Sequence, residues 1–339
     1  MDNRKVPTRR DFLRIGAASA AVGALAACTQ TGAPTEASLV TEAPVLTPKP
    51  PDTPITVAWT SFGLGEPFNM ALASAAEAEA KKHRNVTFIL QDSQADNDLQ
   101  LQQLQAFISQ KVNAVILHPA NPQEIAAGAD EVIAAGIPLI TIPQKVPTMY
   151  GGYIGFDDVL NAQDEMTWVG EQLNGEGNIC ILMGATGHPI VVQRNTGIDN
   201  ALKNFPNIKV LDRQDGEWAK EKSMQITENW LQAYGDKINA IVSHTDVMAM
   251  GAVDVLQSAG KTKVLVAGID GYEAALQYIR EGKMHYTSAL NMPSLGGTAV
   301  RLAIYLATSI APNLTQMGSI WVPNVEIKGA ADAENFTGW

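Results

Sequence analysis

Cysteine is nearly absent from this chain, because only Cys28 and Cys180 occur among its 339 residues. Two isolated cysteines make no CxxC motif and no disulfide framework, so a disulfide-stabilised scaffold and a dithiol redox centre are excluded. Cys180 lies inside the apolar stretch 178–183, which has the composition of a buried strand, and no base adjoins it. We interpret Cys180 as a small core residue and not as a nucleophile.

An excess of positive charge is also missing. The chain has 24 Lys and Arg residues against 35 Asp and Glu residues, and its formal net charge is −11. Nucleic-acid phosphates require a basic surface, so a nucleic acid is excluded as the partner. The acidic balance also argues, more weakly, against an anionic ligand.

Motifs for metal binding and catalysis are lacking as well. The five histidines show no metal-ligand spacing such as HExxH. Asp96 and Asp98 lack the remainder of a calcium-binding loop and are better explained by a helix N-terminus. No Walker loop, dinucleotide fingerprint or G-x-S-x-G motif occurs. We therefore expect no cofactor, no metal and no enzymatic activity.

The apolar run Ile15–Ala27 is too short for a membrane span, which needs about 20 residues. It follows Thr8–Arg14, which resembles a twin-arginine export signal, and it ends at Leu25–Cys28, which resembles a lipobox. We expect residues 1–27 to be an export signal and Cys28 to carry lipid. The mature protein is then expected to be anchored to the outer face of the cytoplasmic membrane, or to be periplasmic. An ordinary amphipathic N-terminal helix is the alternative. Residues 28–53, rich in Thr, Pro, Ala and Ser, are expected to be a disordered tether.

The most informative stretch of the mature chain is residues 112–141. Ala114–Leu117 is a short apolar run, typical of a strand buried on both faces. Asn121 is placed to cap a following helix, with Pro122 in its first turn, and Gly136 is placed to end it. Residues 137–141 then form a second buried strand. A strand, a helix and a strand with short connections predict a parallel βαβ unit, whose strand ends form a ligand-binding edge.

The same alternation of strands and helices continues through most of the chain at intervals of roughly 25 to 30 residues. We predict an α/β fold with two doubly wound parallel sheets of about six strands each, because a single sheet would be unusually wide. A crevice between the carboxyl ends of two such sheets would be a natural ligand site. Strands are expected at residues 55–60, 86–90, 114–117, 137–141, 153–156, 178–183, 208–212, 240–243 and 264–267.

Several segments together resemble the periplasmic sugar-binding proteins of the ribose-binding type, which supply ABC importers. The resemblance extends over about Ile55–Val322. Sugar-responsive repressors share the fold, but they carry a helix-turn-helix where this chain has an export signal. The segments are Gln91–Asn97, Val112–Ile125, Ala134–Thr141, Thr245–Ala252, Leu256–Lys261 and Val266–Gly271.

The resemblance implies two lobes that are joined by three crossing strands and close on the ligand by hinge bending. Carried onto this sequence, it predicts lobe one at 54–157 plus 292–321 and lobe two at 158–291 plus 322–330. Residues 331–339 are then left as a C-terminal tail.

The resemblance also implies how the ligand is held. Aromatic rings cover the apolar faces of the sugar, and polar side chains bind its hydroxyl groups. By position, Phe68 and Trp218 match the aromatic walls. The other predicted ligand-binding residues are Phe62, Asn69, Gln144, Arg194, Thr245, Asp270 and Asn291.

Two departures from the ribose-binding pattern affect the ligand. Pro143 and Gln144 stand where that pattern has Asp-Arg, and Asn69 stands where it has a second aromatic residue. Loss of a charge-assisted pair changes which hydroxyl groups are recognised, which argues against ribose itself. A sugar alcohol, a deoxy sugar or a different small polar ligand is expected instead.

The favoured function is therefore an extracytoplasmic substrate-binding protein that captures a sugar or sugar alcohol by lobe closure. It would deliver the ligand to the permease and ATPase of an ABC importer, while attached to the membrane by its lipid. A receptor for a small sugar-derived or other polar signalling molecule is the alternative among binding proteins. A hydrolase on the same fold is the alternative from another class.

Overall fold

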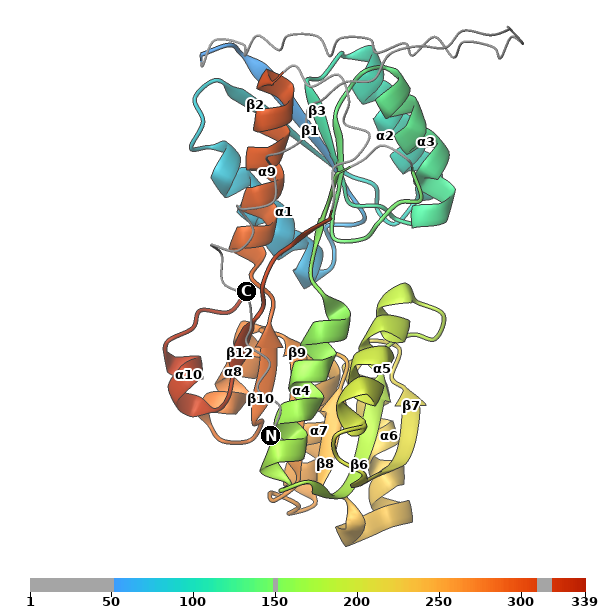
Figure 1. Ribbon diagram of the computed structural model, residues 1–339, viewed down its shortest axis with the longest axis vertical. Coiled ribbons are helices and arrows are strands. Elements are labelled where there is room, and N and C mark those ends of the chain that lie inside the picture. The colour runs from blue at the N-terminus through green and yellow to red at the C-terminus, as the bar shows by residue number, and fades with distance from the viewer. Residues whose placement is uncertain (1–51, 149–151, 310–318) are drawn as a thin grey trace, which may run out of the picture. The chain divides into compact units, whose positions relative to one another are not determined.

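The computed structural model describes residues 52–148, 152–309 and 319–339. All of them belong to one compact unit, Pro44–Trp339. The predicted signal, Cys28 and nearly all of the predicted tether lie outside the described residues. The described part contains two six-stranded sheets with helices on both faces (Figure 1). The predicted fold class, with about six strands in each sheet, is confirmed.

The first sheet is entirely parallel, with the strand order β11-β5-β4-β3-β1-β2. Helices α1 and α9 pack together on one of its faces, and α2 and α3 pack together on the other (Figure 1). The strands are β1 (Ile55–Ser61), β2 (Val86–Asp92), β3 (Ala114–Leu117), β4 (Leu139–Thr141), β5 (Gly152–Gly155) and β11 (Ser319–Trp321). The helices are α1 (Pro67–Ala80), α2 (Asn97–Ser109), α3 (Pro122–Ala134) and α9 (Met292–Thr308).

The second sheet has the order β12-β10-β9-β8-β6-β7, and only its edge strand β12 is antiparallel. Helix α4 packs against α5, and α6 packs against α7. The strands are β6 (Glu176–Met183), β7 (Asn207–Asp215), β8 (Ala240–Ser243), β9 (Leu265–Asp270), β10 (Tyr286–Ala289) and β12 (Val325–Ile327). The helices are α4 (Asp158–Gln172), α5 (Pro189–Leu202), α6 (Lys220–Tyr234), the 3₁₀ turn η2 (Gly235–Lys237), α7 (Asp246–Ser258), α8 (Glu273–Arg280) and α10 (Ala330–Glu334).

The chain changes sheet three times. It passes to the second sheet through α4, returns to the first sheet through α9, and passes once more between β11 and β12. The limits predicted for lobe one and lobe two stay predictions. We call the part built on the first sheet the first half, and the part built on the second sheet the second half.

The βαβ unit of residues 114–141 forms for the local reasons that its sequence indicates. Asn121 Oδ1 accepts hydrogen bonds from the N–H groups of Gln123 (3.0 Å) and Glu124 (3.4 Å), while its amide donates to Glu124 (2.9 Å). Gly136 adopts a φ of +76° after the helix. Strand β4 begins at Leu139, two residues later than predicted, because Pro138 has no N–H to donate to the ladder.

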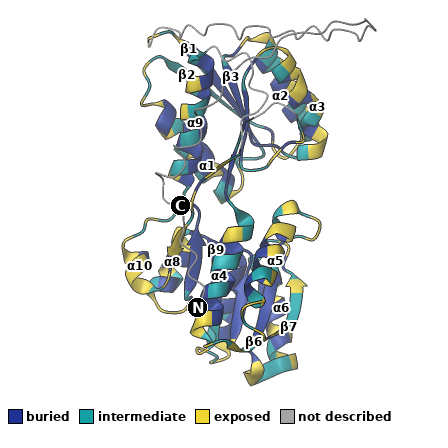
Figure 2. Ribbon diagram, in the orientation of Figure 1, coloured by how far each residue is buried: buried dark blue, intermediate teal, exposed yellow. Residues whose placement is uncertain are grey.

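The core lies between the sheets and the helices that cover them (Figure 2). Strands β3 and β8 are buried at every position, as the apolar runs Ala114–Leu117 and 240–242 predict, and the buried set includes the serine that ends β8. Each central strand therefore anchors the loop that follows it at the carboxyl edge of its sheet.

Candidate functional site

A cavity of about 440 Å³ lies at the carboxyl ends of the strands, within the size range of small-molecule sites. It brings together residues from both halves. Eight of the nine predicted ligand-binding residues line it, namely Phe62, Phe68, Asn69, Gln144, Arg194, Trp218, Thr245 and Asp270. His118, His188, Ile190, Tyr272 and Trp339 are among the other lining residues.

Trp218 is held by an unusual turn. It has a φ of +61° and follows Glu217 at +54°. Asp215 fixes the turn, because its carboxylate accepts from the N–H groups of Glu217 (2.9 Å) and Thr186 (2.7 Å). The indole lies over Gly184, where a Cβ would collide with the ring. The turn directs the indole toward the cavity, and the absence of a side chain at Gly184 leaves room for the ring.

Arg194 is buried and paired, so it is not a solvated helix charge. Its Nε and Nη2 donate to Asp158 Oδ1 at 2.9 and 2.8 Å, and its Nη1 donates to the carbonyl of His244. Only 4% of the residue is exposed. Burial lowers the pKa of Arg194, but the carboxylates of Asp158, Asp270 and Glu165 together raise it above its usual value. The guanidinium is thus a fixed positive charge beside the cavity.

Asp270 ends β9 and lines the cavity while only 6% exposed. Its φ of +142° lies in a region that residues other than glycine rarely adopt, a kind of strain that gathers at functional sites. Burial raises the pKa of Asp270 well above its usual value, and the charge of Arg194 opposes this. Asp246 holds the turn that follows, because its Oδ2 accepts from the N–H groups of Gly271 (2.7 Å) and Tyr272 (3.1 Å).

The other lining residues that we predicted serve the local structure as well. Thr245 caps α7, with its Oγ1 accepting from Met248 N–H at 3.4 Å. Asn69 donates to the carbonyl of Gly63 at 2.7 Å, which fixes the loop after β1. The ring of Phe62 lies 5.9 Å from that of His118. These contacts limit which atoms of Thr245 and Asn69 remain free for a ligand.

Asn291 is the predicted residue that does not line this cavity. Its Oδ1 accepts from Ser294 N–H at 2.9 Å, so it caps α9. Its role in ligand binding stays a prediction.

Sequence reasoning assigned no ligand contact to Tyr272 or Trp339. Tyr272 lies two residues after Asp270, which ends β9, and that position at a strand end is a signal that could have identified it. Trp339 has no such signal, because it belongs to the segment that we interpreted as a tail.

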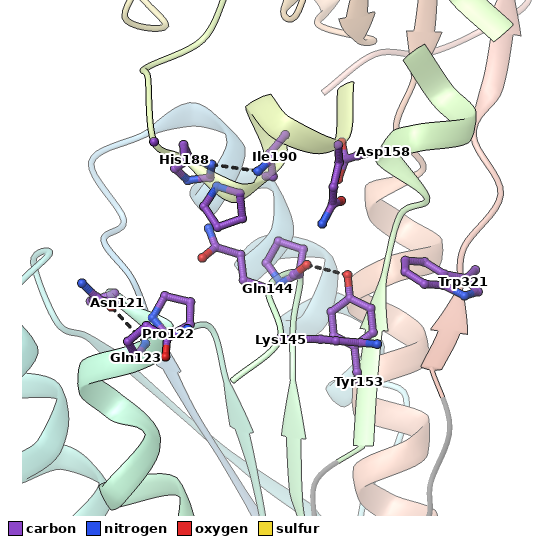
Figure 3. A pocket seen from close by; sticks show the side chains of 15 residues that line it. Asn121, Pro122, Gln123, Gln144, Lys145, Tyr153, Asp158, His188, Ile190 and Trp321 are labelled. Atoms are coloured by element: carbon purple, nitrogen blue, oxygen red, sulfur yellow. Dashed lines mark hydrogen bonds between the residues drawn. The ribbon is translucent and has the colours of Figure 1, made fainter. Parts of the chain in front are cut away.

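A second cavity of about 610 Å³ adjoins the first and shares Pro143, Gln144, His188 and Ile190 with it. Figure 3 shows Gln144, Lys145 and Tyr153 on one side and His188, Ile190 and Asp158 on the other. Lys145 Nζ lies 5.0 Å from the ring centroid of Tyr153 and 5.7 Å from that of Trp321. The Pro143–Gln144 position, where the sequence departs from the ribose-binding pattern, therefore lies where the two cavities meet.

Within residues 52–148, 152–309 and 319–339, no group of three or more His, Cys, Asp or Glu side chains could hold a metal ion. In that same part of the chain, no helix has the length and apolar character needed to cross a membrane.

The chain belongs to the periplasmic binding protein domain family, whose sequence model matches residues 57–310. The xylitol-binding protein of Mycolicibacterium smegmatis is 31% identical over 62% of this chain and 60% of its own length. The ribose import binding protein of Bacillus subtilis is 28% identical over 73% of this chain and 80% of its own length.

Solved structures agree with this assignment. An ABC transporter solute-binding protein from Bacillus halodurans, with bound myo-inositol, has a TM-score of 0.73 and 27% identity. The match covers 84% of this chain and 97% of that one. An ABC transporter periplasmic solute-binding protein from Actinobacillus succinogenes, with bound D-allose, has a TM-score of 0.75 and 25% identity over 83% of this chain and 100% of that one.

The family resemblance seen in the sequence is therefore confirmed, and the fold is that of the type I periplasmic binding proteins. The chain is thus a member of the periplasmic binding protein family, whose members are extracytoplasmic, and the relatives and solved structures that it resembles include sugar- and polyol-binding proteins and solute-binding proteins of ABC transporters.

Proposed function

We propose that this protein captures a small neutral sugar or sugar alcohol by lobe closure and delivers it to the permease and ATPase of an ABC importer. One observation carries the proposal. A single cavity combines aromatic rings with a buried arginine and a buried aspartate, and both halves contribute to it. This combination suits a polyhydroxy ligand, because its C–H faces are apolar and its buried hydroxyl groups require partners.

The charges around the cavity support a neutral ligand. Arg194 is already paired with Asp158, and the other ionisable lining residues include the carboxyl groups of Asp270 and Glu66, which supply no positive charge. Burial lowers the pKa of His118 to about 3, so this lining histidine is uncharged at neutral pH. An anionic ligand would meet no free positive charge among these side chains. Neutral hydroxyl groups can instead accept from Arg194 and donate to Asp270.

Thermal unfolding against a panel of neutral and charged compounds tests the proposal. The panel contains xylitol, D-ribose, D-allose and myo-inositol, with sugar phosphates and amino acids for comparison. A true ligand at about 100 times its Kd adds roughly 2.7 kcal/mol to the free energy of unfolding. Stabilisation by a neutral sugar or polyol is expected. Stabilisation only by the charged compounds would contradict the proposal.

We also propose that Cys28 carries lipid after removal of residues 1–27, because the twin arginines, the apolar run and the lipobox follow in the required order. The intact mass of protein extracted from membranes should correspond to a chain that begins at an acylated Cys28. An unprocessed N-terminus in the mature protein would disprove this part.

A further inference from the structure

Residues 330–339 are attached to the second half by several contacts. The guanidinium of Arg280, on α8, donates to the carbonyl of Ala333 from Nε (3.1 Å) and Nη2 (3.0 Å). Its Nη2 also donates to the carbonyl of Phe336 at 3.3 Å. The side chain of Phe336 packs against the hydrophobic core of the second half. This segment therefore packs against the second half as part of its fold, and it places Trp339 at the cavity.

The position of Trp339 is fixed by hydrogen bonds from its side chain and its backbone. Indole Nε1 donates to the carbonyl of Asp270 at 2.8 Å, and Glu273 N–H donates to the carbonyl of Trp339 at 3.2 Å. Gly338 permits this approach, because a Cβ there would press against the backbone of Gly271 and Glu273. The indole is therefore tied to the same turn that holds the cavity aspartate.

The indole faces other aromatic rings at the cavity. Its centroid lies 4.1 Å from that of Tyr272 and 5.5 Å, edge-on, from that of Phe68. Tyr272, Phe68 and Trp339 all line the cavity beside Asp270. Asn69, the neighbour of Phe68, offers no ring, and its amide is engaged with Gly63. Trp339 thus supplies apolar ring surface close to a buried carboxylate.

We propose that Trp339 contacts the ligand directly and, with Phe68 and Tyr272, forms an aromatic wall that favours ring-shaped ligands over open-chain polyols. This inference rests on the proposed function of sugar or polyol capture. A ring-shaped sugar or cyclitol presents a flat C–H face to an indole, whereas a flexible open chain must lose conformational freedom to do so. The carboxylate of Asp270, beside the wall, would bind a hydroxyl group at the edge of the ring.

Titration calorimetry of the full-length protein with myo-inositol, D-allose, D-ribose and xylitol tests this inference. Trp339→Ala should weaken binding of the cyclic probes by on the order of tenfold, and binding of xylitol less. Trp339→Phe should retain most of the affinity, because an aromatic face remains. Tyr305→Ala removes an exposed aromatic side chain from α9, outside both cavities, and serves as the matched control.

The outcomes separate this inference from the proposed function. If a probe binds the wild type and Trp339→Ala binds it equally well, the aromatic wall is disproved while sugar capture stands. Tighter binding by Trp339→Ala also disproves the wall, because the indole would then be a plug that the ligand displaces. If the wild type binds none of the four probes, and none stabilises it against heat, sugar capture fails and this inference fails with it. Chemical unfolding of each variant without ligand detects any loss of folding.

Discussion

The two halves of the molecule share a backbone plan but place different side chains at the ligand edge. In each half, a histidine follows the third strand in chain order: His118 follows β3 and His244 follows β8. The backbone N–H of each histidine donates to a carbonyl on the first strand of its half, that of Thr60 (3.0 Å) for His118 and that of Leu182 (2.9 Å) for His244. The shared plan gives positions in one half that correspond to positions in the other.

The turn after the second strand shows the same correspondence. Gln94 and Ala95 have φ values of +54° and +59°, and Glu217 and Trp218 have +54° and +61°. In both halves the preceding strand ends in an aspartate whose carboxylate accepts from the turn. The same backbone therefore presents a methyl group in the first half and an indole in the second.

Charge divides the halves most clearly. Ile116 and Val242 each lie two residues before the histidine of their half, and they pair with Ile140 and Ala267, so Pro143 in the first half corresponds to Asp270 in the second, three residues further along the chain in each half. Buried polar side chains near the first-half edge are neutral, as in Gln100, which donates to the carbonyl of His118 at 2.9 Å. The buried ionisable side chains of the second half include Glu165, Arg194, Asp246 and Asp270. We infer that the second half holds the ligand by buried ionisable groups, whereas the first half, apart from the exposed Glu66, contributes neutral and aromatic surface.

The largest expected effect is on stability, from breaking the ion pair between Arg194 and Asp158. Arg194→Ala should lower the free energy of unfolding by about 3–5 kcal/mol, because it leaves buried carboxylates without their counter-charge. Arg213→Ala is the matched control. The side chains of Arg213 and Asp199 are 27% and 55% exposed, against 5% and 12% for Arg194 and Asp158. The control should cost about 1 kcal/mol or less.

Urea unfolding of the two arginine variants measures this difference. Equal losses would show that the buried pair is no more important than an exposed one. The contrast between a charged half and a neutral half would then have no energetic basis.

The next effect is on ligand affinity, and it compares equivalent edges of the two halves. Asp270→Asn keeps the shape of the side chain but replaces one carboxyl oxygen by an amide donor, so a buried hydroxyl group of the sugar loses its acceptor and binding should weaken by about 1–3 kcal/mol. Gln144→Ala, in the first half, should cost about 0.5–1.5 kcal/mol, because it removes only neutral hydrogen bonds. Calorimetric titration with a sugar from the thermal panel gives both values. A larger loss for Gln144→Ala would reverse the assignment of the charged contact to the second half.

Acid sensitivity is a property in which we expect the halves to behave alike. Burial lowers the pKa of both His118 and His244 to about 3, and for His244 the charges of Arg194 and Arg213 act in the same direction. The unfolded chain, with a histidine pKa of about 6.5, then binds a proton that the folded chain does not between about pH 6.5 and pH 3. Each histidine therefore stabilises the fold fully above pH 6.5, and this stability is lost as the pH falls.

Over the interval from pH 6.5 to pH 5, the loss is at most about 2 kcal/mol for each histidine. His118→Asn and His244→Asn should each reduce the loss of unfolding free energy seen in the wild type. The difference from the wild type is the quantity to measure, because burial raises the pKa of Glu165 and Asp270, which act in the opposite direction. A pH profile unchanged in both variants would contradict the lowered pKa values.

The parts of the fold that the sequence predicted are those set by local chemistry. The capping of α3 by Asn121 and the buried strands β3 and β8 depend on residues close together in the chain. Phe62, Gln144, Thr245 and Asp270 could be placed because each lies at or just after the end of a strand, and the carboxyl ends of parallel strands meet at one edge.

The parts that it could not predict depend on contacts between distant segments. The partner of Arg194 is Asp158, on a different helix, and no periodicity relates the two. Trp339 reaches the cavity because Arg280 and Asp270 hold its segment, and neither contact has a signature in the tail itself. An asparagine at position 291 fits both a helix N-cap and a ligand-binding residue, so the sequence pattern alone could not separate those two roles.

The smallest expected effect concerns Trp218 and its counterpart Ala95. Trp218→Phe keeps an aromatic face, so binding should weaken by about 1 kcal/mol or less. The fluorescence change on ligand addition should shrink, because the indole at the cavity is lost while Trp339 remains. Trp230→Phe is the matched control: that indole is buried, 1% exposed, and donates to Asp212, away from the cavity. Suppose that Trp218→Phe showed the wild-type fluorescence change on ligand addition and Trp230→Phe did not. The ligand would then lie elsewhere, and Trp218 would correspond to Ala95 in the backbone plan without taking part in binding.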